Sequence, residues 1–243
     1  MGARANGMGN SFVCIRDEWS MFNNIGGLSA IRKTTAAFTS DLQPALPSSQ
    51  KVAFVCALPV KTGTVGAGIY KFGDDLYNEQ QLCTGYSNKF GIASLGVKLN
   101  YVQYHAEGFG TKGVITVSAG GIAQLTERLS VGAHITNINQ PEIASLEHEH
   151  LPTLLNVGIG FAPSEKLFIT TELQKDLDYK ATWKGGVEYK AHKKVLLRTG
   201  FNVYPAAGFF GVGFKPKKLA LDYAFRYLPA TGGGHQASVA YTF

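Results

Sequence analysis

The chain has 243 residues, of which 45% are hydrophobic, 12% aromatic and only 16% charged, and its formal net charge is +6. Typical soluble domains hold roughly 25% charged residues, so this composition indicates a surface that does not face water everywhere. The longest apolar runs, such as VAFVCALPV, are shorter than the roughly 20 residues of a membrane-spanning helix, which excludes a helical membrane protein. The basic residues recur in short turns rather than along one helix, so we expect no nucleic-acid partner.

Residues 1–28 show none of the alternation that follows them, and they carry more apolar side chains than a solvated tail would. The stretch IRDEWSMF predicts one or two helical turns, which NNIGG then ends. We therefore expect a plug segment inside a barrel, with a disordered tail as the alternative. The start MGARANGMGN lacks a basic and apolar leader, so we expect any signal peptide to be absent from this chain. The expected plug residues are Arg4, Met8, Phe12, Arg16, Asp17, Glu18, Trp19 and Asn24.

Residues 29–243 alternate between apolar and polar side chains with a period of two, which indicates β-strands. In residues 218–228, for example, Tyr223 falls on the apolar face and Asp222 on the polar one. Strands of about 10 residues are long for a sandwich and typical of a membrane barrel. We therefore predict an all-β fold, a transmembrane antiparallel β-barrel of about 14 strands, with a soluble β-sandwich as the alternative. The predicted strands span residues 29–40, 50–60, 64–73, 77–87, 91–106, 113–124, 128–138, 153–161, 166–175, 180–190, 194–204, 207–214, 218–228 and 234–243.

Every second connection between these strands is short, as in KTGT, SNKF and AHKK, whereas residues 41–49, 107–112 and 139–152 form longer ones. Outer-membrane barrels have short periplasmic turns and longer outer loops, so we expect a protein of the bacterial outer membrane with both termini on the periplasmic side. The short turns also hold many lysines. Either the positive charge of this rim has a function, or the lysines are there only because lysine is common in exposed turns. The basic residues of the short turns are Lys61, Lys89, Arg128, Lys166, Lys193, Lys194, Lys215, Lys217 and Lys218.

The polar faces of the predicted strands hold mostly Ser, Thr, Gly and Asn, with few charges. A soluble sandwich would expose many charges there, whereas a narrow lumen keeps its few interior charges paired. We expect Glu188 to pair with Arg198 and Asp222 with Arg226. The expected polar residues of the lumen are Glu172, Glu188, Arg198, Asp222 and Arg226.

No stretch of the sequence indicates catalysis, so we expect neither an enzyme nor a cofactor. LEHEH, at residues 146–150, has two histidines in a predicted outer loop without a third cluster, which favours a solvated loop over a metal site. TGGGHQ lacks the strand-helix context of a phosphate loop and predicts a flexible hairpin. Three widely spaced cysteines indicate packing residues rather than a disulfide framework, and His134 is expected to face the lumen as a packing residue.

Three segments resemble a known family. GARANGMGNSFVCIRDEWSMFNNIGGLSAI, GVEYKAHKKVLLRTGFN and SLGVKLNY are similar to motifs of outer-membrane proteins of the FadL-like superfamily, closest to the PorV/PorQ group of Bacteroidota. The resemblance implies a 14-stranded barrel whose N-terminal segment folds into the lumen. The chain departs from the N-terminal motif at Ile25 and Gly26, where the family has Pro-Ala.

Two functions are compatible with this resemblance. The short outer loops favour an accessory subunit of a larger outer-membrane machine, for type IX protein secretion or outer-membrane protein assembly. Its partners would be outer-membrane lipid and a larger outer-membrane barrel protein or surface lipoproteins. The alternative is a FadL-like channel for small hydrophobic compounds, which needs an apolar pocket near the plug and a lateral opening. The segment around Pro205 to Gly208 is either a strand kink for such an opening or a hairpin turn.

The last residues, HQASVAYTF, alternate up to Phe243, where most termini would fray. We expect this final strand to close on the first, because an open edge in lipid leaves backbone groups unpaired. The ending also resembles the C-terminal signal that barrel-assembly machinery recognises. The expected signal residues are Val239, Tyr241 and Phe243.

Overall fold

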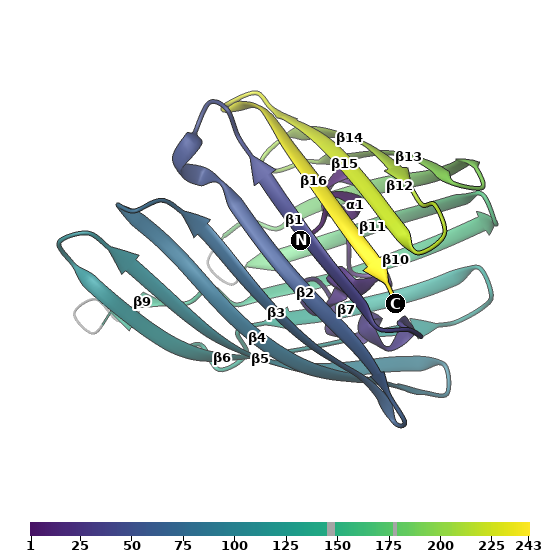
Figure 1. The fold of residues 1–243 in the computed structure, drawn as a ribbon, viewed down its shortest axis with the longest axis horizontal. Helices are drawn as coiled ribbons and strands as arrows, with labels where there is room; N and C mark the ends of the chain where they lie inside the picture. The colour runs from purple at the N-terminus through teal and green to yellow at the C-terminus, as the bar shows by residue number, and fades with distance from the viewer. Residues whose placement is uncertain (145–148, 177–178) are drawn as a thin grey trace.

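The computed structural model describes residues 1–144, 149–176 and 179–243, and these form a closed barrel of 14 antiparallel strands (Figure 1). The order around the barrel follows the chain, apart from the two-stranded β8–β9 sheet, and β16 returns to pair with β1. The pairing runs from Thr35 opposite Thr242 to Leu42 opposite His235. The predicted all-β antiparallel barrel is therefore confirmed.

The strands of the barrel alternate with turns that are short at one rim. Within the described residues no helix is long and apolar enough to cross a membrane. The barrel strands are β1 (Thr35–Leu42), β2 (Lys51–Val60), β3 (Gly63–Gly73), β4 (Tyr77–Phe90), β5 (Ala93–Ala106), β6 (Gly110–Gln124), β7 (Leu129–Thr136), β10 (Leu154–Ser164), β11 (Leu167–Asp176), β12 (Thr182–His192), β13 (Val195–Asn202), β14 (Ala207–Phe214), β15 (Leu219–Leu228) and β16 (Gly232–Thr242). The other elements are α1 (Ala3–Gly7), the 3₁₀ turns η1 (Glu18–Met21), η2 (Ile25–Ala30) and η3 (Pro47–Ser49), and the strands β8 (Glu142–Ala144) and β9 (Glu149–His150).

Two of the strand boundaries that differ from the prediction have a clear local cause, and the other strand ends shift by up to three residues. The first strand begins at Thr35 rather than at residue 29, because Asn24 accepts a hydrogen bond from the backbone of Gly26 and starts a 3₁₀ turn there. SNKF is not a turn but the end of β4, and the chain reverses at Gly91 and Ile92 instead. Gly91 has a φ of 57°, which suits a tight reversal.

Side chains that point outward from the strands are large, apolar and exposed. Phe54, Ile69, Leu82 and Val212 are each more than two-fifths exposed, and they belong to a band that runs round the barrel. A soluble monomer rarely exposes so large an apolar surface. The alternation predicted from the sequence thus places the apolar face outside.

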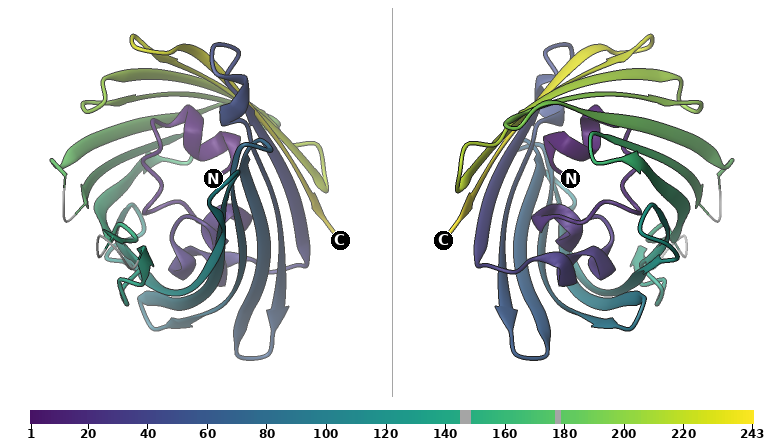
Figure 2. Two further views of the ribbon diagram at one scale, coloured as in Figure 1. Left: turned by 90° about the vertical axis from the view of Figure 1, so that its left-hand side faces the viewer. Right: turned by 90° about the vertical axis from the view of Figure 1, so that its right-hand side faces the viewer.

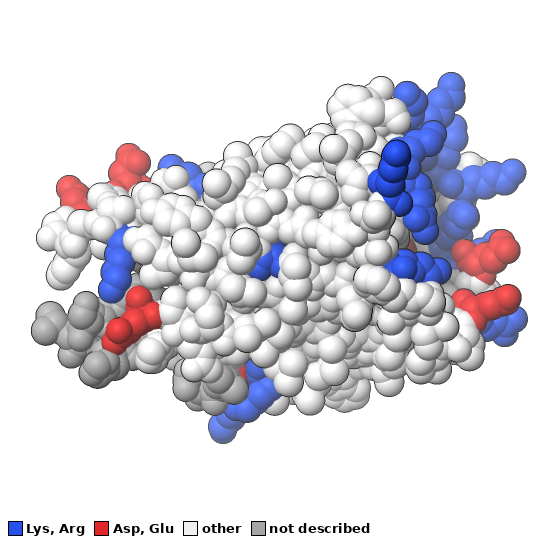
Figure 3. All heavy atoms as spheres, turned by 90° about the horizontal axis from the view of Figure 1, so that it is seen from below, with Lys and Arg blue, Asp and Glu red and all other residues white. Residues whose placement is uncertain are grey.

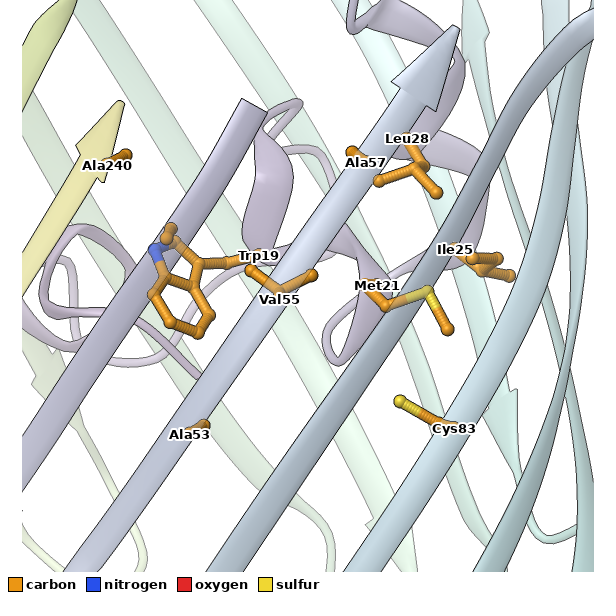
Figure 4. Packing of buried hydrophobic residues seen from close by; sticks show 10 residues of the cluster. Trp19, Met21, Ile25, Leu28, Ala53, Val55, Ala57, Cys83 and Ala240 are labelled. Carbon is orange, nitrogen blue, oxygen red and sulfur yellow. The ribbon is translucent and has the colours of Figure 1, made fainter. Parts of the chain in front are cut away.

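The segment before β1 lies inside the ring of strands, where Figure 2 shows it in purple. It has room because many inward positions are glycine. A methyl group at Gly66 would lie 2.7 Å from the Met21 sulfur, and one at Gly211 would lie 3.1 Å from the Cα of Gly7. Its apolar side chains form the main core with small inward residues of β1, β2, β4 and β16 (Figure 4). The core residues are Trp19, Met21, Ile25, Leu28, Ala37, Ala53, Val55, Ala57, Cys83 and Ala240.

Candidate functional site

A network of ion pairs joins the N-terminal segment to the barrel wall. Arg4 in α1 donates to Glu188 on β12 at 2.7 Å, and Arg198 on β13 donates to the same carboxylate at 2.6 Å. Arg198 also donates to Asp222 on β15 at 2.6 Å, while Arg4 reaches Asp17 at 3.3 Å. The side chain of Arg198 is fully buried, so its two carboxylate partners are needed to offset the loss of its hydration.

Only one of the two predicted pairs forms as expected. Glu188 and Arg198 lie opposite each other in the register of β12 and β13. Arg226 pairs with Asp41 on β1 at 2.8 Å rather than with Asp222. Residues four apart on one strand are about 13 Å apart, so a partner from another part of the wall is nearer.

Glu172 on β11 holds the middle of the N-terminal segment. Its carboxylate accepts hydrogen bonds from the backbone N–H groups of Phe12 and Val13, at 2.7 and 2.8 Å, and from the side chain of Asn156 at 2.6 Å. The ammonium of Lys184 lies 3.5 Å away. These donors compensate for burying the charge.

The remaining predicted plug residues divide between packing and polar contacts. Met8 and Trp19 are buried among apolar neighbours, whereas Asn24 donates to the carbonyl oxygens of Val13 and Gly121 at 2.7 and 3.1 Å. Burial lowers the pKa of Arg16. Burial has the opposite effect on an acid, whose pKa it raises, and the adjoining 3₁₀ turn η1 contains one such acid. Burial, followed by the nearby charge of Asp17, raises the pKa of Glu18 to about 7.

A cavity of about 590 Å³ lies between the N-terminal segment and the longer loops, and we call it the vestibule. Phe12 and Phe22 contribute to its lining, each with a lysine ammonium over its ring: Lys184 at 5.3 Å and Lys98 at 6.0 Å. The rest of its lining is largely amide, hydroxyl and tyrosine side chains, with Lys51 and Glu79 as further charged groups. The vestibule can therefore hold a small molecule that is flat and weakly polar.

The wall beside the vestibule contains an incomplete seam between β6 and β7. The two strands pair only from Ala119 opposite Ile135 to Gln124 opposite Ser130. Beyond that point the backbone of Ile138 donates to Val117 at 2.9 Å. The side-chain amide of Asn139 takes the place of a strand: it accepts from the N–H of Val117 and donates to the carbonyl of Ile115, both at 2.9 Å.

An apolar groove of about 1150 Å³ runs along the outside of the same wall. Its floor holds small outward-facing residues, Ala119, Gly121 and Ala133, and larger ones such as Leu155 and Trp183 flank them. The groove reaches the seam at Ala119 and Ile135, where the pairing begins, and the vestibule reaches it from the inner side at Thr116, Thr136 and Asn137.

Sequence reasoning missed this seam and placed a candidate kink elsewhere. Residues 203–206 form the hairpin turn between β13 and β14, which was the alternative for that segment. The positive φ of Asn137, 56°, ends β7 early and turns the chain towards β6. The sequence NINQ, with two asparagines after a strand, was the only signal that could have pointed to it.

The other described residues show little that indicates a metal site or a catalytic site. Among the described residues no group of three His, Cys, Asp or Glu side chains could hold a metal ion. His134 is buried beside Gly120, and neither ring nitrogen has a hydrogen-bond partner. Residues 146–148 of LEHEH lie outside the described residues, and His150 contacts the carbonyl of Gln140 at 2.9 Å.

The C-terminal residues lie where β16 meets β1. Val239 is opposite Phe38, and the backbone of Phe243 donates to Thr34 at 2.9 Å. The rings of Tyr241 and Phe243 pack edge to face, with centroids 5.0 Å apart. Their part in an assembly signal stays a prediction.

Comparisons with known proteins point to one group of barrels. No protein-family model matches the chain, and no curated protein matches it. Among solved structures, the toluene transporter TbuX of Ralstonia pickettii has a TM-score of 0.81 and 12% identity, covering 100% of this chain and 98% of its own. The P. putida toluene transporter TodX has a TM-score of 0.77 and 11% identity, covering 100% and 98%. The CymD monoaromatic hydrocarbon channel has a TM-score of 0.74 and 12% identity, covering 100% and 97%.

These comparisons correct the expected function. The three barrels are hydrocarbon transporters or channels of the FadL family, so the expectation of an accessory subunit of a secretion or assembly machine is wrong and the alternative is the better supported of the two. The likeness gives no support to a closer relation with the PorV/PorQ group of Bacteroidota. What the chain shares with TbuX, TodX and CymD, at this level of identity, is the FadL-like barrel fold over its whole length.

Proposed function

We propose that this chain is a non-enzymatic channel for small hydrophobic compounds in the bacterial outer membrane, with its N-terminal segment as a plug in the lumen. The fold and the exposed apolar band support a membrane-spanning barrel. The observation that carries the proposal is the incomplete β6–β7 seam, which meets the vestibule at Thr136 and Asn137 and the apolar groove at the neighbouring Ile135. In this proposal both termini lie on the periplasmic side, at the rim with the short turns.

The seam offers an easier way out of the vestibule than the plug does. Opening the seam next to Val117 breaks four hydrogen bonds, two of them to the side chain of Asn139 and one to the hydroxyl of Ser118. A typical hydrogen bond contributes about 0.5–1.5 kcal/mol. Removing the plug would break buried ion pairs, and the loss of a single such partner costs about 3–5 kcal/mol. A hydrophobic compound would therefore leave sideways into the lipid rather than pass through the plug.

The vestibule favours a compact compound over a long one. Its floor presents the rings of Phe12 and Phe22, against which a planar molecule can pack, and its volume is about 590 Å³. Polar groups line much of the remaining wall, so a long alkyl chain would leave many of them without partners. We propose a substrate of about the size of a monoaromatic ring.

The proposal is tested by uptake of radiolabelled toluene into cells that carry the barrel, against cells that carry an empty vector. Ala119→Phe fills the groove at the seam and should lower uptake severalfold. Its matched control is Ala237→Phe, which places the same ring in a second outer groove, across β1, β14, β15 and β16, and should leave uptake unchanged.

The outcomes separate the function from the route. Uptake by wild-type cells no faster than by empty-vector cells would reject the channel. Fast wild-type uptake with equal rates for Ala119→Phe and Ala237→Phe would keep the channel and reject the seam as its exit. Both variants should be checked for normal amounts of folded barrel by their altered gel mobility before and after boiling.

A further inference from the structure

One rim of the barrel carries a ring of positive charge, which Figure 3 shows as blue side chains gathered at one end. Each junction between strands at the short-turn rim contributes at least one exposed or half-buried basic residue, and so does the segment that leads into β1. We call this ring the basic collar. It consists of Arg32, Lys33, Lys61, Lys89, Arg128, Lys166, Lys193, Lys194, Lys215, Lys217 and Lys218.

Exposure alone does not explain the collar, because the opposite rim has a different charge. The connections there are equally open to solvent, yet their ends carry acids that include Asp74, Asp75, Glu107 and Glu142. On the collar side, the turns described here hold only Glu127 and Glu165 as acids. The opposite rim therefore mixes acids with lysines such as Lys71, Lys112 and Lys180, whereas the collar is almost entirely basic.

The collar begins where the apolar band ends. Lys215 follows the outward-facing Phe214, and Lys61 follows Val60, which is likewise exposed. A long lysine side chain at such a boundary keeps its methylene groups against apolar surface and its ammonium in the polar layer. This is the depth at which lipid headgroup phosphates lie.

The collar is densest over the β10–β15 sector. On the lumen side of this sector a hollow of about 380 Å³ is lined by five lysines, and its acids are Glu165 and the inward-facing Glu188. Glu188 already accepts hydrogen bonds from Arg4 and Arg198. Burial, followed by repulsion from Arg4, lowers the pKa of Lys215, as expected for one cation among several. The lysines of the hollow are Lys166, Lys190, Lys193, Lys194 and Lys215.

We propose that the basic collar binds the phosphate groups of anionic phospholipids in the leaflet around the short-turn rim. A protein partner would dock on one side and needs a patch, whereas the surrounding leaflet meets the rim on all sides and fits a ring. Each basic residue near an anionic membrane surface adds to the electrostatic attraction, so a ring of them selects anionic over zwitterionic lipid. This inference rests on the membrane location in the proposed function and is independent of transport.

The test measures lipid selectivity at the barrel surface. The barrel is reconstituted in phosphatidylcholine vesicles with trace spin-labelled phosphatidylglycerol or spin-labelled phosphatidylcholine, and the motionally restricted fraction of each label is recorded. We expect a severalfold preference for phosphatidylglycerol, which falls as salt is added because the charges are exposed. Substituting Lys193, Lys194 and Lys217 by Gln removes three of the eleven charges and should lower the preference for phosphatidylglycerol measurably.

The control removes the same charge from the other rim. Substituting Lys71, Lys112 and Lys180 by Gln should leave the preference unchanged. Equal association of both labels with the wild type, or a preference that is unchanged in the collar variant, would overturn the proposal. So would inorganic phosphate if it abolished the preference at an ionic strength where chloride does not, because the site would then be one for free phosphate. Toluene uptake should be the same in both variants, so a failure here leaves the channel function standing.

Discussion

The N-terminal segment contacts the barrel in two different ways. Its polar half, residues 2–17, is held to the wall by ion pairs and hydrogen bonds, such as those of Arg4 with Glu188 and of the Ala3 backbone with Ser238 at 2.8 Å. Its apolar half, residues 18–30, packs Trp19 and other large side chains on small residues of the opposite strands. The polar half also has a small apolar cluster of its own, around Met8.

The difference follows from what each wall offers. The inward positions of β12, β13 and β15 carry charges, and an α-helical turn with Arg4 satisfies them. The inward positions of β2 carry alanine and valine, and Ala37 of β1 lies in the same cluster, so apolar side chains fit there without leaving polar groups unpaired. One segment is thus held by ion pairs and hydrogen bonds in one half and by apolar packing in the other. The two kinds of interaction respond differently to salt, to pH and to truncation of a side chain.

Trp19→Ala should have the largest effect. Deleting a buried aromatic side chain typically costs about 3–5 kcal/mol, and Trp19 is 2% exposed. We expect this loss in the free energy of unfolding, from guanidinium titration in lipid vesicles, and faster hydrogen exchange in the apolar half. Trp183→Ala, at an outward-facing tryptophan, is the control and should not change exchange in that half. An equal increase in the rate of hydrogen exchange in both halves would show that the segment behaves as one unit.

Glu188→Ala should have the second largest effect on the stability of the barrel. It removes the shared partner of Arg4 and Arg198, which costs about 3 kcal/mol, the low end for a buried pair because Arg198 keeps Asp222. Hydrogen exchange should rise in the polar half and stay slow in the apolar half. Glu165→Ala, in an exposed turn, is the matched control. If exchange rose in the apolar half alone, the assignment of the two halves would be wrong.

Gly211→Ala should have an intermediate effect. A methyl group there would lie 3.1 Å from the Cα of Gly7, and backbone cannot move aside as a side chain can, so we expect a cost of about 1–3 kcal/mol. Gly208→Ala on the same strand meets nothing within 4 Å and should be neutral. Thermal unfolding of the two variants in the same detergent measures the difference, and similar midpoints would argue against close packing of α1.

The pH dependence of the apolar half should be the smallest effect. The pKa of Glu18 is raised to about 7 from an ordinary value of 4.5, so its ionisation opposes the packed state. Packing is therefore strongest below about pH 4.5 and weakens as the pH rises through 7. Hydrogen exchange in residues 18–30, corrected for its intrinsic pH dependence, should rise over this range. Glu18→Gln should remove the rise, and a rise that persists in that variant would assign it to another group.

Most of the strand pattern was readable from the sequence because the period of two is local. Residues 218–228 were predicted as a strand, and β15 spans Leu219–Leu228. The start of β1 was misplaced, because a 3₁₀ turn of six residues also brings apolar side chains together. The pairing of Arg226 with Asp41 was not predictable, since it joins β15 to β1 across a gap of 185 residues.

The candidate site was harder to predict than the fold. The polar lumen residues were recognised as inward-facing, but nothing in a strand pattern says that Glu172 receives the backbone of Phe12 and Val13. The β6–β7 seam was missed, because the length of a strand pairing is decided by its neighbours. Asn139 acts there through its side chain, which sequence alternation does not register.

By itself the sequence determined the outward apolar face, the alternation of short and long connections and the apolar character of the segment before the first strand, because each depends on residues close together in the chain. The tertiary structure alone decided which wall each half of that segment meets, which charges pair and where the barrel wall is weakest. Those features depend on the register of 14 strands around a closed ring, and closure brings together residues from opposite ends of the chain.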